Sequence, residues 1–432
     1  TDQVIPIATA AVRNAANQAL FLAKVKAETG IDFRVASGEE EAYYGYMGVI
    51  NTMKVAAGVM IDIGGASTEV GWIEDRKLKQ AVSFPFGAVT LTEQFLGREP
   101  INPEKVKQVE DYVIRHLESQ DWISRLQGYP VIGLGGTIRS LAKMNRYKIG
   151  YPLESLPNYQ MRLDEVAFHY QQVTTGTLED IRKIPGINKD RSDIFTAGIT
   201  PLWALMNTLD SRKLMISGNG LREGVFYEQY LQETQGPGTL IEEVTLHSVE
   251  NTLKNFDMNL AHCHQVKKLA LSLFDQTRAL HGLGDEERRL LTVGALLHDV
   301  GMYIDYYNHH KHGFYLTLNA RLNGLRNRER VMCAYLVGLH RAANLKEDWQ
   351  QYDMLIDGKD LEIIHKLSLF IQIAEKLDRS ETGSVSDLTC YLTPSDLQIM
   401  VQSETNTELE VATAMAFSKD FKKLYGRKLF II

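Results

Sequence analysis

The 432-residue sequence lacks most features of secreted, membrane-spanning and nucleic-acid-binding proteins. Its three cysteines, Cys263, Cys333 and Cys390, show no paired spacing, which argues against a disulfide framework or a zinc knuckle and favours a reducing compartment. No apolar run approaches the roughly 20 residues needed to cross a bilayer. The net charge of −7 argues against general nucleic-acid binding. We therefore expect a soluble cytoplasmic protein with no membrane or specific nucleic-acid partner.

The first residues of the sequence have the pattern of an αβ unit whose first elements are absent. Periodicity predicts a strand over 4–9, a helix over 10–28 and a strand over 33–36, and no methionine stands at position 1. We therefore expect residues 1–46 to be the remainder of a first domain whose opening part is missing. The edges of its remaining strands would be exposed or covered in another way.

Residues 47–235 alternate between predicted strands and helices, which is typical of an α/β domain with a mixed sheet. Helical periodicity covers 103–120 and 164–176, and further helices are expected from Ile138 and from near Leu221. The expected strands are 58–63, 68–74, 77–85, 130–134 and 213–217.

The last part of the chain changes character after a Gly-Pro-Gly segment, which predicts a linker over 234–239. Residues 240–382 show almost only helical periodicity and predict a separate all-α domain. In 383–432, apolar and polar residues alternate over 396–402 and 408–414, which predicts a small β-containing cap.

Glycine loops follow three of the predicted strands. The first lies between two strands, so it is a hairpin loop and not the strand-to-helix turn of a dinucleotide-binding site. Backbone N–H groups and hydroxyls in such loops suit an oxyanion, and the flanking Asp62 and Glu69 suit a divalent cation. A plain tight hairpin is the alternative, but three such loops predict a common phosphate cradle. Its candidate residues are Gly64, Gly65, Ala66, Ser67, Thr68, Gly135, Gly136, Thr137, Gly218 and Gly220.

Five segments, in this order, resemble the exopolyphosphatase and guanosine pentaphosphate phosphohydrolase family, a branch of the actin and sugar-kinase superfamily. They span residues 1 to about 230, and together they are far more specific than any one of them. The segments are Ala8–Ala15, Ser37–Ala42, Asp62–Glu69, Gly135–Thr137 and Gly218–Gly224.

This resemblance implies an actin-like, ribonuclease H-like phosphatase module whose second domain is 47–235. It implies that Glu41 activates the attacking water, that Arg13 clamps phosphate oxygens, and that Asp62 and Glu69 hold Mg²⁺. The substrate would be polyphosphate or a guanosine penta- or tetraphosphate, and we expect a homodimer. The family's fold begins with a strand and a glycine-serine loop that do not precede Val4 here, so the resemblance also implies that the chain as it stands hydrolyses polyphosphate poorly or not at all. Without the resemblance, Glu41 could equally belong to a solvated acidic helix start, and Arg13 to the surface.

Histidines are concentrated in the predicted helical domain: eight of the twelve lie between His262 and His340. Imidazole and carboxylate ligands together suit Mn, Fe, Ni or Zn. The order His264, then His298-Asp299, then Asp378 resembles the HD phosphohydrolase superfamily, and members of the phosphatase family carry an HD-like helical domain. His312 and His340 are candidates for a second metal or for phosphate. A relic without metal is the alternative.

Two basic groups could hold a polyanion despite the acidic total. One is near the end of the chain, and the other comprises Arg321, Arg326, Arg328, Arg330 and Arg341. The preferred function is release of terminal phosphate from inorganic polyphosphate. Hydrolysis of guanosine pentaphosphate, non-catalytic sensing of polyphosphate or an alarmone, and nucleotide hydrolysis at the histidine site remain alternatives.

Overall fold

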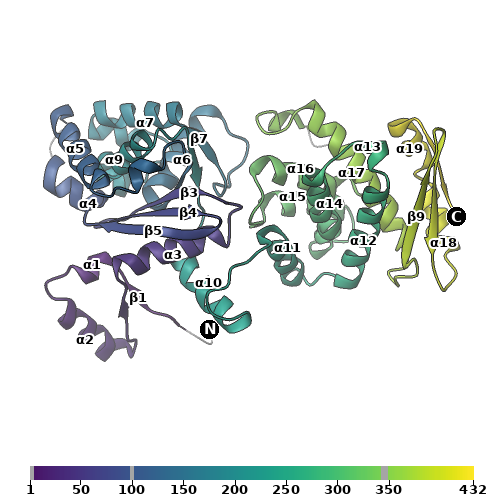
Figure 1. The fold of residues 1–432 in the computed structure, drawn as a ribbon, viewed down its shortest axis with the longest axis horizontal. Coiled ribbons are helices and arrows are strands. Elements are labelled where there is room, and N and C mark those ends of the chain that lie inside the picture. The colour runs from purple at the N-terminus through teal and green to yellow at the C-terminus, as the bar shows by residue number, and fades with distance from the viewer. Residues whose placement is uncertain (1–3, 98–101, 342–348) are drawn as a thin grey trace. The chain divides into compact units, whose positions relative to one another are not determined.

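The computed structural model describes residues 4–97, 102–341 and 349–432, and the chain divides into two compact units (Figure 1). The first runs to Glu242 and the second from Glu243 to Ile432. No helix among the described residues is long and apolar enough to cross a membrane.

The first residues form a small αβ layer. Strands β1 (Ile7–Ala8) and β2 (Arg34–Val35) pair in parallel. The prediction of a single helix over 10–28 is wrong, because the structure has two separate helices, α1 (Ala10–Arg13) and α2 (Gln18–Thr29). The break contains Asn14 and Asn17, whose side chains compete for backbone hydrogen bonds and weaken a helix. α2 then ends at Gly30, which has the left-handed φ of 73° common after helices.

A six-stranded sheet in the order β5-β4-β3-β6-β8-β7 is the centre of the first unit. The pairs β3–β6 and β6–β8 are parallel and the others antiparallel, so the prediction of a mixed α/β sheet is confirmed. The central β3 is apolar and buried except at Asp62, as expected of a strand covered on both faces. The strands are β3 (Gly58–Ile63), β4 (Thr68–Glu74), β5 (Lys77–Phe84), β6 (Val131–Leu134), β7 (Gln160–Arg162) and β8 (Lys213–Ile216).

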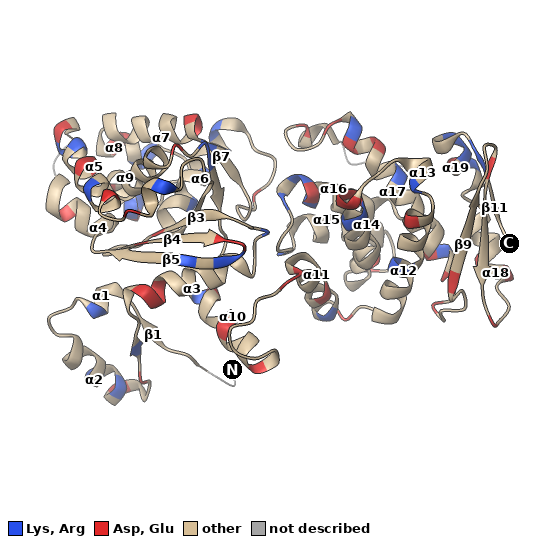
Figure 2. Cartoon of the chain, in the orientation of Figure 1, with Lys and Arg blue, Asp and Glu red and all other residues tan. Residues whose placement is uncertain are grey.

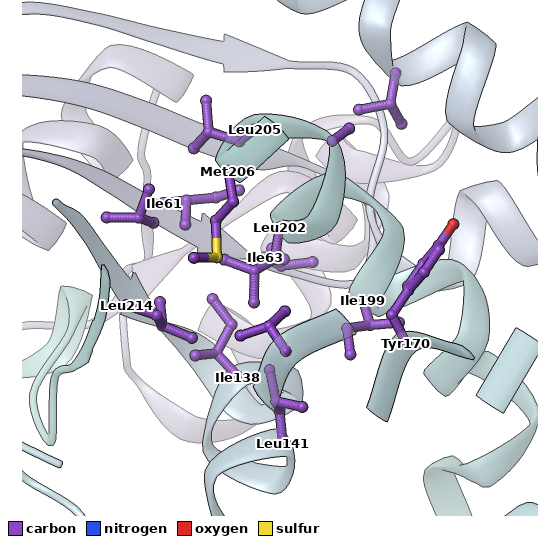
Figure 3. Packing of buried hydrophobic residues seen from close by; sticks show 14 of the residues in the cluster. Ile61, Ile63, Ile138, Leu141, Tyr170, Ile199, Leu202, Leu205, Met206 and Leu214 are labelled. Atoms are coloured by element: carbon purple, nitrogen blue, oxygen red, sulfur yellow. The ribbon is translucent and has the colours of Figure 1, made fainter. Parts of the chain in front are cut away.

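Helices cover both faces of this sheet. Figure 1 shows α3 and α10 on one side and α5, α6, α7 and α9 on the other. Between the sheet and this second group lies the main core, where Ile61 and Leu214 of the sheet face Leu141 of α6 and Leu202 of α9 (Figure 3). The helices are α3 (Gly38–Ile50), α4 (Ala88–Leu91), a π-helical turn (Thr92–Leu96), α5 (Pro103–Glu118), α6 (Gly135–Ile149), α7 (Leu163–Thr175), α8 (Leu178–Lys183), α9 (Ser192–Thr208) and α10 (Leu221–Thr234), with short 3₁₀ turns at Ile123–Arg125 and Lys189–Arg191.

The helices α3 and α10 touch through their backbones. A Cβ atom added to Gly224 would lie 1.8 Å from the carbonyl oxygen of Tyr44, and one added to Gly48 would lie 2.4 Å from that of Gly220. Only glycine fits at these two positions. The contact therefore fixes α3 against the residues that follow β8.

The second unit is mainly helical, as the periodicity predicts. Its bundle is followed by a three-stranded sheet in the order β11-β10-β9. The helices are α11 (Val244–Asn255), α12 (Leu260–Gln276), α13 (Arg278–His281), α14 (Asp285–Leu297), α15 (His309–Asn319), α16 (Asn327–Leu339) and α17 (Gly358–Leu377), with 3₁₀ turns at Val300–Tyr303 and Trp349–Tyr352.

The terminal sheet agrees with the sequence only in part. Strand β10 (Asp396–Gln402) has the expected limits and pairs antiparallel with β9 (Asp387–Leu392) and parallel with β11 (Lys428–Ile431). The strand expected over 408–414 is wrong, because this segment is helix α18 (Glu408–Met415), followed by α19 (Ser418–Tyr425). Polar and apolar residues alternate in this segment, as in a strand. The segment also consists largely of good helix formers, Glu, Leu, Ala and Met, and their helix propensity decides the local structure.

Candidate active site

Three successive glutamates begin α3, and each has a different environment. The side chain of Ser37 accepts a hydrogen bond from Glu40 N, while Glu40 Oε2 accepts one from Ser37 N at 2.7 Å, which completes a capping box. Glu39 is exposed. Glu41 turns inward and is only 8% exposed. Of the three, only Glu41 therefore lies inside the protein.

Arg13, at the end of α1, pairs with Glu41. Its Nη1 donates to Glu41 Oε1 and also to the carbonyl oxygen of Ala36, at 2.6 Å in the second case. The Arg13 side chain as a whole is 25% exposed. Arg13 thus fixes the carboxylate of Glu41 while its outer N–H groups remain accessible.

Asp62 and Glu69 flank the hairpin loop at the ends of β3 and β4, where they pair across the ladder. Burial raises the pKa of Asp62 to about 6, with a further rise from the Glu41 carboxylate and an opposing effect of the Arg139 guanidinium. Burial raises the pKa of Glu69 to about 7, although Ser67 and Ser83 donate hydrogen bonds to it. Three carboxylates thus interact electrostatically, an arrangement that a bound cation would stabilise.

The hairpin loop offers fewer donors than the sequence predicts. The N–H group of Gly64 donates to Ser67 O at 3.0 Å, and the Thr68 hydroxyl donates to Phe86 O at 2.8 Å. These two expected phosphate ligands are therefore engaged within the protein, and Ser67 contacts Glu69. Among the described residues, the N–H groups of Gly65 and Ala66 have no protein acceptor. The tip of the loop is where an oxyanion would bind.

The second glycine segment is a helix start, which corrects the expected loop before Ile138. α6 begins at Gly135, has no side-chain cap, and places Gly136 and Thr137 in its first turn. The first N–H groups of a helix lack acceptors inside it and favour an anion. Gly135 has a φ of 87°, and a Cβ there would lie 2.7 Å from Asp62 Oδ1. The start of α6 therefore lies directly against Asp62.

The third segment contributes mainly to packing. The N–H group of Gly220 donates to Glu223 Oε2 at 3.0 Å, so it is not a free phosphate ligand. A Cβ on Gly218 would lie 2.4 Å from Pro157 Cγ. A Cβ on Gly220 would lie 3.8 Å from Asp62 Oδ2. All three segments thus approach Asp62 or its neighbours, but the first two carry the available donors.

Two arginines near this site escaped the sequence analysis. Arg139 on α6 lies close enough to attract the charge of Asp62. The Arg191 Nη1 atom lies where a Cβ of Gly136 would be, at 2.4 Å, and Arg191 is exposed. Arg191 follows a polar stretch, Asn188-Lys189-Asp190, that has no pattern to distinguish it from a surface loop. Its position depends on the packing of the segment before α9 against α6.

In the second unit, four histidines surround Asp299. His309 Nε2 lies 3.2 Å from Asp299 Oδ1 and 2.9 Å from His340 Nε2. His298 Nε2 lies 3.4 Å from Asp299 Oδ2 and 3.2 Å from His262 Nε2. Among the described residues, these form two groups that could each hold a metal ion, His262-His298-Asp299 and Asp299-His309-His340.

The expected ligand set changes in three places. The prediction that His264 is a metal ligand is wrong. Its side chain lies outside both groups, is 41% exposed and contacts Glu250 at 3.3 Å. On α12, it is His262 that faces inward. His309 takes the place expected for His312. Asp378 belongs to neither group, but it accepts a hydrogen bond from His262 Nδ1 at 2.8 Å.

Charges within this cluster are strongly coupled. Burial favours the neutral form of His298, but the adjacent Asp299 carboxylate outweighs it and raises the pKa of His298 to about 9. Burial also opposes ionisation of Asp299, yet the surrounding histidines hold its pKa well below the usual range. The carboxylate of Asp299 therefore stays ionised at neutral pH.

The expected arginine group is not a basic surface. Arg330 is buried and donates to two backbone carbonyls, while Arg326 and Arg328 form ion pairs with Glu286, Glu329 and Asp360. Figure 2 shows acidic and basic residues intermixed on these helices. The basic residues of α19, by contrast, include exposed Lys422 and Lys423.

The model of the Ppx/GppA phosphatase family matches residues 1–233, and that of domain III of the same family matches residues 244–419. The chain belongs to the Ppx/GppA phosphatase family. It is 29% identical over 386 residues to a guanosine-5′-triphosphate,3′-diphosphate pyrophosphatase of Pseudoalteromonas atlantica, which covers 87% of this chain and 73% of that protein.

Solved structures include similar folds. An exopolyphosphatase of Cytophaga hutchinsonii has a TM-score of 0.50 and 24% identity, over 54% of this chain and 77% of that one. A Ppx/GppA family member of Aquifex aeolicus has a TM-score of 0.47 and 27% identity, over 54% and 75%. In this Ppx/GppA chain, the first matched region contains the cluster around Asp62 and the second contains the histidines around Asp299.

Proposed function

We propose that this chain releases terminal phosphate from inorganic polyphosphate by attack of water at the cluster around Asp62. Its family membership makes it a phosphoanhydride hydrolase. The observation that carries the proposal is the convergence of Glu41, Asp62 and Glu69 with the free N–H groups of Gly65 and Ala66 and the start of α6. Carboxylates and N–H donors together suit a metal–phosphate complex.

Asp62 and Glu69 are the residues that would hold Mg²⁺. Burial raises the pKa of both carboxylates, which fits a site that takes up positive charge. When bound, Mg²⁺ supplies charge neutralisation for the transferring phosphoryl group. Ser67 and Ser83 orient Glu69 by donating hydrogen bonds to it.

Glu41 orients the attacking water and accepts its proton. Its carboxylate is held by Arg13 on one side, which leaves the second oxygen, Oε2, for the water. Because Glu41 also raises the pKa of Asp62, the two carboxylates lie within electrostatic reach of each other. Water held by Glu41 would therefore face a phosphate bound near Asp62.

The terminal phosphate would bind at the Gly65-Ala66 tip and the first turn of α6. The accessible N–H groups of Arg13 and the guanidinium of Arg191 supply the cations around it. As the anhydride bond breaks, negative charge moves to the departing oxygen, and these donors stabilise it. The shortened polyphosphate is a stable anion that leaves without needing a covalent intermediate.

Hydrolysis of guanosine pentaphosphate is the second candidate. It is favoured by the likeness to the Pseudoalteromonas atlantica protein, whose name states that activity. The reaction at phosphorus is the same, so Glu41, Asp62 and Glu69 would keep their roles. The two candidate substrates differ in the part of the molecule that lies beyond the terminal phosphates.

Phosphate release from long-chain polyphosphate and from guanosine pentaphosphate tests the proposal directly. We expect Mg²⁺-dependent turnover with kcat/KM for polyphosphate at least about tenfold higher, equivalent to about 1.4 kcal/mol. The reverse ratio would establish the second candidate. Tight binding of either compound without turnover would show that the chain is a sensor. Glu39→Gln is the control for Glu41→Gln, because Glu39 is the exposed member of the same helix turn.

A further inference from the structure

We infer that the second unit contains a binding site for a small organic monocarboxylate with an apolar body, in a pocket between α17 and α19. This site shares no residue with the cluster around Asp62 or with the two histidine groups around Asp299. Its ligand is therefore distinct from the substrate of the phosphoanhydride reaction.

The pocket has a volume of about 620 Å³, within the range of cavities that hold small organic molecules. His365, Ser368 and Gln372 recur at helical spacing and line it from α17. Asp420 and Leu424 are one turn apart and line it from α19. Two helices that pack on each other thus leave a space between one pair of their faces.

The side chains at these faces explain why the space is not filled by core residues. Elsewhere α19 is held by apolar contacts: Phe421 is fully buried, and the rings of Tyr425 and Phe370 of α17 stack with their centroids 6.2 Å apart. At the pocket the facing positions are mainly polar, and Ser368 is small and only 4% exposed. Polar residues between packed helices depart from the pattern of a core, and such departures are expected at functional sites.

Two cations line the pocket without a carboxylate partner among the described residues. Lys423 on α19 forms no ion pair in this part of the chain. Arg341 contacts His309 Nδ1 at 3.3 Å and stacks over the ring of Tyr306, and neither partner is an anion. Figure 2 shows the basic residues of α19. The positive charge at the pocket is therefore available to an anionic ligand.

A second pocket of the same unit has cations that are already compensated. It has a volume of about 470 Å³ and is lined by Arg278, Arg288 and Arg289. Arg278 and Arg288 pair with Asp275, and Arg289 pairs with Glu329. An anion would have to compete with these carboxylates. The pocket between α17 and α19 is therefore the better anion site, although it has fewer basic residues.

The charge of the lining favours a monoanion. Asp420 also lines the pocket, and it forms no ion pair among the described residues. Partial burial and the charge of Lys423 lower the pKa of His365, so its imidazole is neutral at pH 7. Arg341 and Lys423 together with Asp420 leave one net positive charge. A carboxylate neutralises this charge, whereas a phosphate monoester is nearly doubly charged at pH 7 and would be repelled by Asp420.

The most buried part of the pocket is apolar. Leu339 and Leu369 line it and are 5% and 3% exposed, and the ring of Phe417 adds apolar surface from the residue before α19. Covering these side chains would remove apolar surface from water, which favours binding. An aromatic or branched aliphatic body therefore fits here while its carboxylate meets the two cations.

Ligand-observed NMR titrations of the full chain, without Mg²⁺ or polyphosphate, are the first test. 4-Phenylbutyrate should bind with a Kd of about 1 mM or lower. It should bind at least about tenfold more tightly than butyrate, which lacks the ring, and than 4-phenyl-1-butanol, which lacks the charge. A Kd above about 1 mM for both 4-phenylbutyrate and octanoate, or equal affinity for the charged and uncharged compounds, would overturn the proposal.

Variants of α19 test the location of the site. Lys423→Ala should weaken binding of 4-phenylbutyrate by about tenfold, because a charge-assisted hydrogen bond is lost. Lys422→Ala is the matched control and should leave the Kd unchanged, since Lys422 is exposed on the same helix but does not line the pocket. Leu424→Trp should weaken binding by filling the pocket from a half-exposed wall. Equal losses in the two lysine variants would place the ligand on the basic surface of α19 and contradict the proposal.

Asp420→Asn tests the preference for a single charge. The wild type should bind 3-phenylpropyl phosphate no more tightly than 4-phenylbutyrate, and Asp420→Asn should improve the affinity for the phosphate ester more than that for the carboxylate. A wild type that prefers the phosphate ester would show that the ligand is not a monocarboxylate. Circular dichroism of each variant establishes that it is folded. Because these titrations contain neither Mg²⁺ nor polyphosphate, their outcome does not depend on the reaction proposed at Asp62.

Discussion

Glu69→Gln should make the metal-free protein more stable at alkaline pH although it abolishes Mg²⁺ binding. Glu69 is 4% exposed, and burial raises its pKa from 4.5 to about 7. Between these pH values the folded chain holds a proton that the unfolded chain releases, so stability falls as pH rises. At 1.36 kcal/mol per pKa unit, the ionised Glu69 costs about 3 kcal/mol at pH 8, and about 2 to 3 kcal/mol of this develops between pH 5 and 8.

The assay is urea unfolding in the presence of a chelator at several pH values. Tryptophan fluorescence reports mainly on the first unit, because three of the four tryptophans, Trp72, Trp122 and Trp203, lie in it, and the fourth, Trp349, lies in the second. The wild-type midpoint should fall from pH 5 to 8, and that of Glu69→Gln should fall less. At pH 8, Mg²⁺ at about 100 times its Kd should stabilise the wild type by about 2.7 kcal/mol and the variant by almost nothing.

Glu118→Gln is the matched control, since it makes the same change at an exposed position at the end of α5. Its pH dependence should equal that of the wild type. If the wild type were equally stable at pH 5 and pH 8 without metal, or if Glu69→Gln were less stable than the wild type at pH 8, burial of an ionised Glu69 would not be the cost that we infer.

Three further predictions concern the first unit. Glu41→Gln should lower kcat by about 100-fold or more and change polyphosphate binding little, since a positioned base contributes at least that factor; a variant retaining a tenth of the rate would point to another base. Arg191→Ala should lower kcat/KM by about 10- to 100-fold, as expected for charge-assisted hydrogen bonds of about 1.5 to 3 kcal/mol, with partial recovery in Arg191→Lys; an unchanged KM and kcat would remove Arg191 from the site. Leu202→Ala, in the core of Figure 3, should reduce the free energy of unfolding by about 2 to 5 kcal/mol in urea titrations, and a loss below about 1 kcal/mol would mean that the core refills the cavity.

Most strands of the first unit's sheet could be predicted from the sequence, because strands such as β3 and β6 are short apolar runs between turn residues, whereas the short polar β7 (Gln160–Arg162) was missed. β3, β4 and β10 have the predicted limits. The errors arose where two patterns overlap. Residues 408–414 alternate like a strand but consist of helix formers, and 10–28 is periodic like one helix but is interrupted by asparagines.

The chemistry of the sites was less predictable, because residue type does not show which partner a group takes. Thr68 and Gly220 look like phosphate donors in the sequence, yet one donates to Phe86 and the other to Glu223. His262 and His264 differ by only two positions, and which of them faces inward depends on how α12 packs. Arg191 comes to the site only through the tertiary contact with Gly136. Which side chains meet at these sites is decided by how the helices and strands pack against one another.

The backbone contact between α3 and α10 has a consequence for synthesis of the chain. Glu41 is made early, but its helix is fixed by Gly48 and Gly224 only when the residues after β8 have been added. At about 5 to 20 residues per second, this interval lasts roughly 10 to 40 s. During it, the apolar face of α3 that α10 later covers is open to other chains and to chaperones on the ribosome. A substitution at Gly224 would prolong that exposure indefinitely, so its first effect in a cell would be aggregation or degradation of the nascent protein rather than a slower enzyme.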